Sequence, residues 1–542
     1  MQYFNFYKRV FFSYLFIILF TSLFLIVKCE FQLELISNLF ENIFFALLVI
    51  APSFFLENKT LRKFYGLFAF LFFSITIMIE SIYYCLFQVF FSASTIFVVM
   101  ESNFNEAIEY VNFYFGLSEA FYLFSTIFLI VVLKRSIKTV YSELKFPTKK
   151  KALASSLLIF IIFSSLKYSK LIIYNFPYLF IKSSIEYYQT SKNFDLSSKN
   201  KDGYFTNVQI KSTKINPVFV LVLGESTVRS HMQLYGYGRN TNPRLTELSD
   251  QLMIYEDVIS PHALTVESIT KMLTLSNYES NEIKKGSIIQ LANAAGYITS
   301  WLSNQRPVGI FESLITKIAL SASKSDFIST AYGQHNRTLD QDLLPLLYKE
   351  LNSQSNHPKF IIIHLMGTHF KYENRYPDSL NKFFTNAKSN KYLSDVEIIK
   401  NKYDRAVLNN DYVVYEIIKS VKQSTDCGAV LYVSDHGEEL EEIKYRGHNE
   451  DFATKDMFDI PFFLWQSEKH RKFSPVCYDP NRQYMNDDLF HSLADILEIR
   501  AEEVDSVRSI FSKSYKERKR LILDGQDYDT KFSVNYLNDL QD

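Results

Sequence analysis

Residues 217–226, with the sequence PVFVLVLGES, decide the fold, because six consecutive apolar residues lead into a glycine, a glutamate and a serine. The run does not alternate between apolar and polar residues, which is typical of a strand that helices cover on both faces. Similar runs are PKFIIIH (358–364), AVLYVS (429–434) and IPFFLW (460–465). Helical patterns occupy 283–295, 339–352, 394–422 and 486–498. This alternation predicts an α/β domain with a mainly parallel sheet covered by helices on both faces.

Polar side chains follow three of these predicted strands at the point where each strand ends. Glu225 follows the first run, His364 ends the second with His369 five residues later, and Asp435 and His436 follow the third. Ligands bind outside the carboxyl ends of the strands in open α/β sheets, so we expect these side chains to share one crevice. None of the four cysteines lies in a CxxC pair. Oxygen and nitrogen ligands without a thiolate favour zinc or manganese.

The stretch HALTVESITKMLTL (262–275) places Thr265 just before a helical pattern. On the residues alone, an ordinary N-cap is the favoured interpretation of this threonine. The alternative is that Thr265 is a nucleophile beside the metal, at a helix N-terminus that also receives a phosphate group. Both interpretations remain open at this point.

The first third of the chain contains five apolar runs. Residues 10–27 carry no charge and are about as long as a bilayer requires, which is roughly 20 residues. Four more runs follow, around 39–56, 64–91, 120–133 and 152–166. A single cleaved signal peptide would not be followed by such a series, so we predict five membrane-spanning helices.

Charged residues predict the orientation of these helices. Lysines and arginines gather before residue 10, between 57 and 63, and between 134 and 151, which places those segments in the cytoplasm. We therefore predict a membrane domain at 1–167, an interfacial helix and linker at 168–212, and a catalytic α/β domain outside the cytoplasm at 213–542. Basic and acidic residues balance at 58 each, so no global charge indicates a nucleic-acid partner.

Glu80 lies inside the third apolar run, where an ionisable side chain is costly and is a functional candidate. The favoured interpretation is that this run is longer than a membrane span and that Glu80 lies near its aqueous end.

Five motifs together carry a family resemblance. They are GESTVRSHMQLYGYGRNTNPRL (224–245), HALTVESITKML (262–273), HLMGTH (364–369), SDHGEEL (434–440) and RGH (446–448). In order and spacing they resemble the lipopolysaccharide phosphoethanolamine transferases of the alkaline-phosphatase/sulfatase superfamily, whose five-span anchor is also similar. The resemblance covers nearly the whole chain. It implies a multi-pass enzyme of the bacterial inner membrane with its catalytic domain in the periplasm.

The resemblance also implies a catalytic site. The implied zinc ligands are Glu225, Thr265, Asp435 and His436, with Thr265 as the nucleophile that receives phosphoethanolamine. One catalytic zinc ion is expected, a second is left open, and manganese is less favoured. His369 and His448 would contact the phosphate or a second metal ion, and one of them would protonate the leaving oxygen.

Four further residues match segments implied to bind substrate. His364 is the other histidine of HLMGTH, and Asn304 belongs to WLSNQ (301–305). Ser102 and Glu106 belong to ESNFNEA (101–107), which resembles the family's TNxxEA segment, so Glu106 is a candidate contact for the donor's amine.

The implied donor is phosphatidylethanolamine, and the implied acceptor is a lipopolysaccharide or lipooligosaccharide. Members that modify lipid A have a cysteine pair flanking the nucleophile segment, whereas this chain has Pro261 and Lys271 there. The segment WLSNQ (301–305) is more similar to the members that modify core heptose. Together, these two features favour a core sugar over lipid A as the acceptor.

Three alternatives are weighed against this interpretation. A phosphoglycerol transferase of the lipoteichoic-acid-synthase kind shares the five spans and the threonine, but GES and HLMGTH favour ethanolamine. A sulfatase would need a cysteine or serine in a C/S-x-P/A-x-R context, which Thr265-Val266-Glu267 does not provide. A non-catalytic membrane receptor or scaffold is disfavoured because every matched site residue is present.

Overall fold

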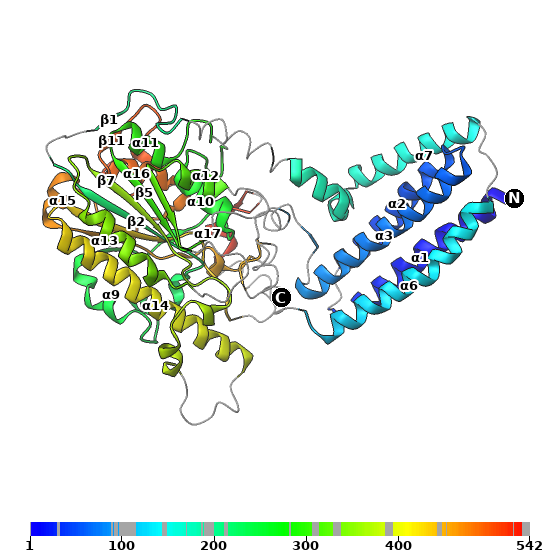
Figure 1. The fold of residues 1–542 in the computed structure, drawn as a ribbon, viewed down its shortest axis with the longest axis horizontal. Helices are drawn as coiled ribbons and strands as arrows, with labels where there is room; N and C mark the ends of the chain where they lie inside the picture. Colours follow the sequence, from blue (N-terminus) through cyan, green and yellow to red (C-terminus); the bar gives the residue numbers. More distant parts are fainter. Residues whose placement is uncertain are drawn as a thin grey trace. The chain divides into compact units, whose positions relative to one another are not determined.

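The computed structural model describes residues 2–29, 33–87, 90–91, 96, 115–143, 149–169, 171–185, 188, 200–210, 215–280, 283–305, 314–328, 338–384, 394–441, 447–450, 453–523 and 525–533. The chain divides into two compact units. One comprises Met1–Val99 and Phe104–Tyr187, and the other comprises Met100–Asn103 and Tyr188–Asp542. Figure 1 labels the main helices and several strands.

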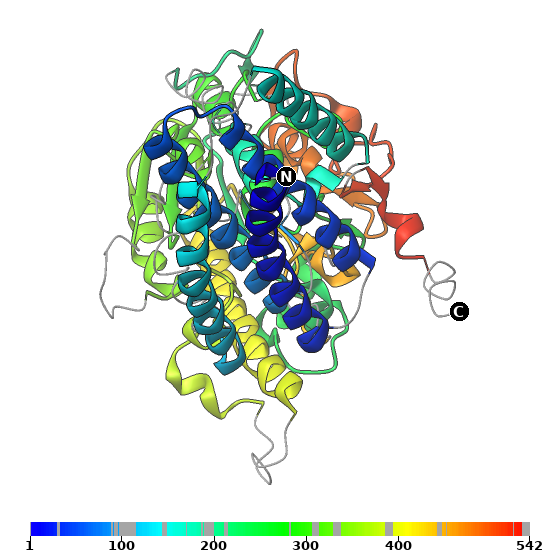
Figure 2. The same ribbon diagram turned by 90° about the vertical axis from the view of Figure 1, so that its right-hand side faces the viewer.

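The first unit is helical. Its main helices are α1 (Gln2–Lys28), α2 (Leu33–Ile50), α3 (Lys59–Phe87), α6 (Leu117–Glu143) and α7 (Lys149–Tyr168). Among the described residues, α1, α2, α3 and α6 each contain a segment long and apolar enough to cross a membrane. The apolar part of α7 is shorter, Ile159–Tyr168. The long blue and cyan helices of this unit run side by side in Figure 2, and α1 packs against α2, α3 and α6.

A buried polar cluster joins these helices to the chain that follows α7. Glu80 is only 3% exposed, and its Oε1 accepts a hydrogen bond from the backbone N of Phe176 at 3.0 Å. Glu41 is also buried, and its Oε1 accepts from Asn175 Nδ2 at 2.8 Å. Asn175 Oδ1 in turn accepts from Tyr178 N at 3.0 Å, at the start of a helix over 176–185. Glu80 therefore binds the backbone of the chain that follows α7, and its place near an aqueous end stays a prediction.

The second unit is built on a seven-stranded sheet in the order β3-β9-β8-β2-β7-β5-β6. The strands are β2 (Val218–Gly224), β3 (Leu252–Tyr255), β5 (Ile298–Ser303), β6 (Lys324–Phe327), β7 (Lys359–His364), β8 (Gly428–Ser434) and β9 (Phe462–Gln466). The five strands from β8 to β6 run parallel, whereas β9 is antiparallel to both of its neighbours. The sheet is therefore mixed, and all four predicted strand runs lie in it.

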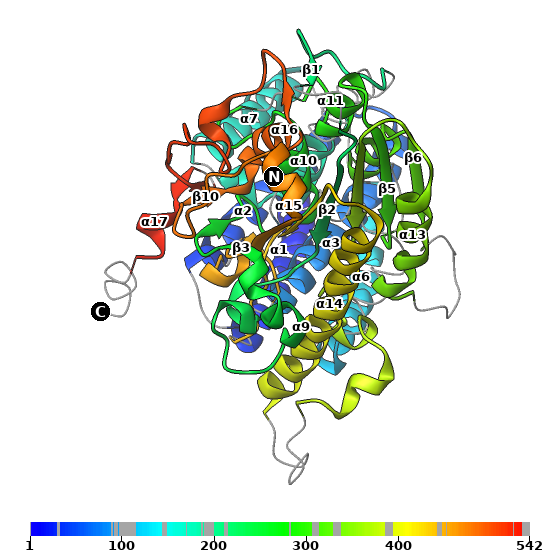
Figure 3. The same ribbon diagram turned by 90° about the vertical axis from the view of Figure 1, so that its left-hand side faces the viewer.

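Helices cover both faces of the sheet. Successive residues of a strand point to opposite faces, so the residues of β2 pack alternately in two cores. Phe219, Leu221 and Leu223 of β2 pack in a core with α10 (Thr265–Leu273), α11 (Ile288–Ala294), α12 (Leu314–Leu320) and α16 (Leu489–Ile496). Val220 and Val222 of the same strand pack in a second core with α13 (Leu344–Asn352) and α14 (Asp395–Ser424). Figure 3 shows these two helical layers with the strands between them.

Short elements complete this unit. They are α9 (Pro243–Glu247), α15 (Glu468–Phe473), α17 (Tyr528–Lys531), β1 (Gln209–Ile210), β4 (Val258–Ile259), β10 (Tyr484–Met485), β11 (Ile499–Arg500), β12 (Leu521–Ile522) and β13 (Gln526–Asp527). The short strands form three two-stranded sheets, β1 with β11, β4 with β10, and β12 with β13. Cys427 and Cys477 are both free, so no disulfide joins them.

The carboxyl ends of the three central strands lie next to one another. Leu365 N, just after β7, donates to Leu223 O of β2 at 3.0 Å. Asp435 N, just after β8, donates to Gly224 O at 3.1 Å. The residues that follow β2, β7 and β8 are therefore brought to one edge of the sheet, as the sequence predicted.

Candidate active site

A strained turn after β2 presents the side chain of Glu225. Ser226 has a φ of 54°, a left-handed value that is uncommon for a residue with a side chain. Its N donates to Asp435 Oδ1 at 3.0 Å, and its carbonyl oxygen accepts from Tyr403 Oη at 2.7 Å and Thr368 Oγ1 at 2.8 Å. These three bonds hold a backbone conformation that would otherwise be unfavourable.

The glycine of HLMGTH allows the loop after β7 to approach this turn. Gly367 has a φ of 52°, and a Cβ atom there would lie 2.7 Å from the carbonyl oxygen and 2.8 Å from the backbone N of Glu225. Any larger residue would push the Glu225 backbone away.

Asp435 and His436 leave β8 with defined orientations. Asp435 Oδ1 accepts from the backbone N of Ser226 and from that of His436 at 2.7 Å, whereas Asp435 Oδ2 is buried and has no hydrogen-bond partner among the described residues. His436 Nδ1 lies 2.8 Å from the carbonyl oxygen of Gly437. A carbonyl oxygen can only accept, so Nδ1 carries the proton. In the neutral ring the lone pair is then on Nε2.

Thr265 lies where these side chains meet. Its Oγ1 donates to Glu225 Oε1 at 3.0 Å and lies 3.3 Å from His436 Nε2. Leu264 is the N-cap residue of α10, and its side chain makes no capping bond. The favoured N-cap interpretation of Thr265 was therefore wrong, because its hydroxyl group points to Glu225 and His436.

Four side-chain atoms of this edge converge as a candidate set of metal ligands. His436 Nε2 lies 3.4 Å from Glu225 Oε1 and 3.4 Å from Asp435 Oδ2. The ligand atoms of these three residues all lie within 4.8 Å of one another. With Thr265 Oγ1 they make four oxygen and nitrogen donors, which fits zinc. The buried Oδ2 of Asp435, which accepts no hydrogen bond from the described residues, is the observation that calls for a cation here, because a buried polar atom without a hydrogen bond is costly.

The three titratable groups shift each other's ionisation. Burial opposes ionisation of Glu225, but the hydrogen bond and charge of His436 outweigh it and hold the pKa of Glu225 well below its usual range. Burial, together with the negative charge of Glu225, raises the pKa of Asp435 well above its usual range. Burial disfavours the charged imidazole, but Asp435 and Glu225 outweigh this effect and raise the pKa of His436 to about 10. The site therefore favours a positive charge among its carboxylates.

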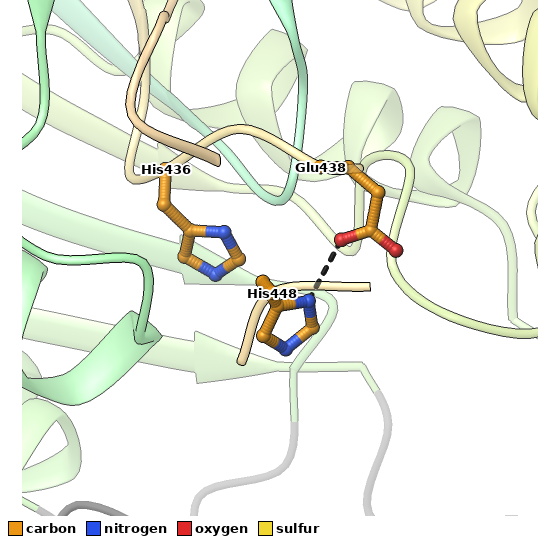
Figure 4. Close-up of side chains that lie close together, drawn as sticks. All are labelled: His436, Glu438 and His448. Carbon is orange, nitrogen blue, oxygen red and sulfur yellow. Dashed lines mark hydrogen bonds and ion pairs between the residues drawn. The ribbon is translucent and has the colours of Figure 1, made fainter. Parts of the chain in front are cut away.

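A second group of polar side chains adjoins the first. His448 Nδ1 lies 2.7 Å from Glu438 Oε2, and the rings of His448 and His436 are 4.6 Å apart between centroids (Figure 4). Together, His436, Glu438 and His448 form another cluster that could hold a metal ion. No role was predicted for Glu438 from the sequence. Its place two residues after His436 in SDHGEEL was the available signal.

His369 lies near His448, with ring centroids 6.4 Å apart. Burial lowers the pKa of His369 to about 4, so this imidazole is neutral near pH 7. The structure therefore places His369, His448 and Thr265 around one site.

Glu450 connects the segment that carries His448 to the segment that carries Thr265. Its Oε1 accepts from Ala263 N at 2.9 Å and lies 3.0 Å from His262 Nδ1. Glu450 lies two positions after His448, and Ala263 lies two positions before Thr265. This contact fixes the two chain segments against each other.

The four residues implied to bind substrate are not placed alike. His364 is 2% exposed, and its Nδ1 lies 3.2 Å from Ser303 Oγ. Asn304 is 1% exposed, and its Nδ2 donates to Asp340 Oδ1 at 2.8 Å. Both side chains contact buried protein groups beneath the edge of the sheet. Ser102 and Glu106 lie outside the described residues.

The fold and the site define a class of protein. A mixed α/β sheet places a threonine and a cluster of acids and histidine at the carboxyl ends of its central strands, and residues 217–499 match the Sulfatase family. The phosphoethanolamine transferase EptC of Escherichia coli (strain K12) is 30% identical over 485 residues, which are 84% of this chain and 83% of that protein. The chain therefore belongs to the phosphoethanolamine transferases of the sulfatase family, and it is an enzyme.

Another relative and two solved structures are also similar to this chain. The phosphoethanolamine transferase CptA of Salmonella typhimurium is 29% identical over 487 residues, 84% of this chain and 83% of that protein. The C-terminal periplasmic domain of E. coli EptC, crystallised in complex with Zn, is 32% identical with a TM-score of 0.55, covering 60% of this chain and 96% of that domain. The integral membrane protein EptA from Neisseria meningitidis is 19% identical with a TM-score of 0.65, covering 93% and 98%, and shows the same fold.

Proposed function

We propose that this chain transfers phosphoethanolamine from phosphatidylethanolamine to a lipopolysaccharide or lipooligosaccharide, through a covalent intermediate on Thr265, and releases diacylglycerol. The observation that carries the proposal is the position of Thr265 Oγ1, 3.0 Å from Glu225 Oε1 and 3.3 Å from His436 Nε2. A threonine hydroxyl group is a weak nucleophile unless its surroundings help it to ionise. Relatives named phosphoethanolamine transferases support the choice of transferred group.

In the first step, the oxygen of Thr265 forms a bond to phosphorus, and the bond from phosphorus to the diacylglycerol oxygen breaks. Glu225 Oε1 already accepts a hydrogen bond from the hydroxyl group of Thr265, so it orients the oxygen for attack, and the hydroxyl proton would pass to a histidine of the site. The leaving oxygen needs a proton, and His448 is suited to supply it because Glu438 holds its Nδ1 and would stabilise the imidazolium form. His369, being neutral, is suited to accept a hydrogen bond or a proton.

A zinc ion held by Glu225, Thr265, Asp435 and His436 would supply positive charge that stabilises the ionised threonine and the phosphoryl oxygens. The proposal includes one such ion. The cluster of His436, Glu438 and His448 supports a second ion nearby. Manganese is less favoured, because the relative's periplasmic domain was crystallised with Zn.

In the second step, the acceptor hydroxyl group attacks the phosphorus, its proton passes to a histidine of the site, and the bond to Thr265 breaks. Thr265 is then free for another cycle. We propose a core sugar of the lipopolysaccharide as the acceptor rather than lipid A, since the chain has WLSNQ at 301–305 and has no cysteine pair at 261 and 271.

We further propose an arrangement for these membrane-bound substrates. Residues 1–167 would cross the inner membrane five times, 168–212 would form the interfacial helix and linker, and 213–542 would work in the periplasm. Four apolar helices and the shorter apolar part of α7 support five spans. Ser102 and Glu106 remain proposed contacts for the donor head group. His364 and Asn304 remain proposed for substrate binding, acting through the loops they support.

The test uses detergent-purified full-length protein with zinc and phosphatidylethanolamine that bears a fluorescent acyl chain. Diacylglycerol release and the intact mass of the protein are followed for the wild type and for Thr265→Ala. Wild type should release diacylglycerol and gain one phosphoethanolamine on Thr265, and both signals should be absent from the variant and after chelation. Thr265→Ser is the matched control, because it keeps the hydroxyl group.

Other outcomes would select an alternative. If phosphatidylglycerol, but not phosphatidylethanolamine, gave product and a Thr265 adduct, the chain would be a phosphoglycerol transferase. If neither lipid reacted with the zinc-loaded wild type, the proposed reaction would be wrong, and a non-catalytic role at the membrane would replace it.

A further inference from the structure

Gln305 reaches the metal-ligand cluster from a strand that does not belong to it. It lies two residues beyond the end of β5, and β7 separates β5 from β2 in the sheet. Its Nε2 donates to Glu225 Oε2 at 3.0 Å and to the carbonyl oxygen of Leu365 at 2.9 Å. One amide group therefore connects the ends of three neighbouring strands.

The orientation of this amide group is defined by its partners. A glutamine NH₂ group has two hydrogens, and both acceptors here are oxygens that cannot donate. Rotating the amide by half a turn would place its own oxygen against a carboxylate and a carbonyl group. Both N–H groups of Gln305 are therefore committed, one of them to the carboxylate of Glu225.

The two oxygens of Glu225 have different surroundings as a result. Oε1 accepts from Thr265 Oγ1 at 3.0 Å and from Ser226 Oγ at 3.0 Å, and it lies 3.4 Å from His436 Nε2. Oε2 is occupied by Gln305. Only Oε1 therefore faces the other three ligand atoms.

Buried contacts at the end of β5 hold Gln305 itself. Its backbone N donates to Ser303 Oγ at 3.0 Å, and the same hydroxyl group lies 3.2 Å from His364 Nδ1. Asn304 N donates to the carbonyl oxygen of His364 at 3.0 Å. The backbone before and at Gln305 is thus fixed to β7, so the side chain has a rigid base from which to reach Glu225.

We propose that Gln305 is a positioning residue for zinc: by holding Oε2 of Glu225, it presents this carboxylate to the ion through Oε1 alone. The inference rests on the zinc site proposed above and adds a residue that determines its affinity. Groups that hydrogen-bond to metal ligands fix the orientation of those ligands, and their loss lowers metal affinity by about 10- to 100-fold.

The test compares Gln305→Met with Gln466→Met in the full-length detergent-purified protein. Methionine has nearly the length of glutamine but has no N–H group. Gln466 is a matched control because its Nε2 also makes two bonds, one with His470 Nδ1 at 2.9 Å and one with Ser474 O at 3.0 Å. Gln466 pairs with Ala429 near the start of β8, whereas Asp435 follows the end of the same strand. Gln305→Asn keeps the amide but shortens its reach, and serves as a second variant.

Zinc affinity is measured by competition between the metal-stripped protein and a chromogenic chelator, and turnover is measured against free zinc. Gln305→Met should weaken zinc binding about 10- to 100-fold, and excess zinc should restore most of its turnover. Gln305→Asn should also weaken binding, and Gln466→Met should bind zinc as the wild type does.

Unchanged zinc affinity in folded Gln305→Met or Gln305→Asn would overturn this inference and leave the proposed function intact. A loss of turnover that saturating zinc does not restore, with unchanged affinity, would overturn it as well. If wild type itself bound no zinc or formed no Thr265 adduct, the proposed function would fail instead.

Discussion

Each unit of this molecule contains a pair of buried glutamate or aspartate side chains, and the two pairs differ in what surrounds them. Glu41 and Glu80 lie among the membrane helices, and Glu225 and Asp435 lie at the edge of the sheet. All four side chains are at most 3% exposed. Burial of a carboxyl group therefore does not by itself identify a catalytic site here.

The partners of the two pairs separate their roles. Glu41 and Glu80 accept from the side chain of Asn175 and the backbone of Phe176, so they hold the chain after α7 against the helices. Backbone that leaves a helix within a membrane protein must find such partners. Glu225 and Asp435 instead direct oxygens towards His436 Nε2, and Thr265 Oγ1 joins them. The convergence of carboxylate, imidazole and hydroxyl groups distinguishes the candidate active site from the buried pair among the helices.

The largest expected effect comes from neutralising one acid of each pair. Asp435→Asn keeps an oxygen for the backbone N–H groups of Ser226 and His436, but it replaces Oδ2 with an NH₂ group that cannot bind a cation. Zinc binding should be lost, and turnover should fall on the order of 10³-fold. Glu80→Gln keeps the acceptor for Phe176 and should leave turnover within about threefold of wild type. The adduct assay on both variants checks this, and equal losses of turnover would remove the distinction between the pairs.

The next effect concerns the backbone that positions Glu225. In Gly367→Ala, the new Cβ atom would lie within 3 Å of the Glu225 backbone, and a φ of 52° is unfavourable for alanine. We expect a loss of about 3 kcal/mol in the free energy of unfolding, together with weaker zinc binding. Gly238→Ala is the matched control, because a Cβ atom there meets nothing within 4 Å. Denaturant unfolding of the two variants measures the difference, and similar stabilities would show that the loop after β7 yields easily.

In the membrane unit, a smaller effect is expected from Glu41→Ala, which leaves Asn175 Nδ2 without its acceptor. Loss of one partner of a buried hydrogen bond costs about 2 kcal/mol. Glu41→Gln retains an oxygen for Asn175 and should cost much less. Hydrogen exchange of the Tyr178 amide, which Asn175 caps, reports the change directly. Faster exchange in Glu41→Gln than in Glu41→Ala would contradict an anchoring role for this pair.

The sequence predicted the convergence of Glu225 and Asp435 well and the contacts of Glu41 and Glu80 poorly, for a physical reason. Runs such as VFVLVL at 218–223 are wholly apolar, so their burial, and hence the shared edge where Glu225 and Asp435 lie, followed from the pattern. The backbone N that Glu80 accepts from belongs to Phe176, 96 positions away along the chain. No local pattern reports such a contact.

Two features of the sheet also escaped prediction. Strand β5 has the sequence ITSWLS, whose Thr299, Ser300 and Ser303 are fully buried although they are polar. The hydroxyl groups of these residues form hydrogen bonds with Asn293, Glu350 and Gln305. Because three of its six residues are polar, the strand was not recognised as an apolar run. Because β5 was missed, the contact of Gln305 with Glu225 was missed as well. The antiparallel direction of β9 depends on how the chain returns from the loop after β8, and IPFFLW carries no sign of direction.

The smallest expected effect concerns His364, a buried titratable residue near Glu225. Burial lowers the pKa of His364 to about 4, whereas an unfolded chain has a histidine pKa of about 6.5. Between these values the unfolded chain binds one more proton, so His364 destabilises the fold as the pH falls. Lowering the pH from 7 to 6 should cost about 0.7 kcal/mol through this residue. The pH dependence of unfolding should flatten by this amount in His364→Asn but not in His357→Asn, whose histidine is exposed. If the two variants matched each other, His364 would have to be accessible to protons in the folded chain, which would favour the proposed contact with substrate over a purely supporting role.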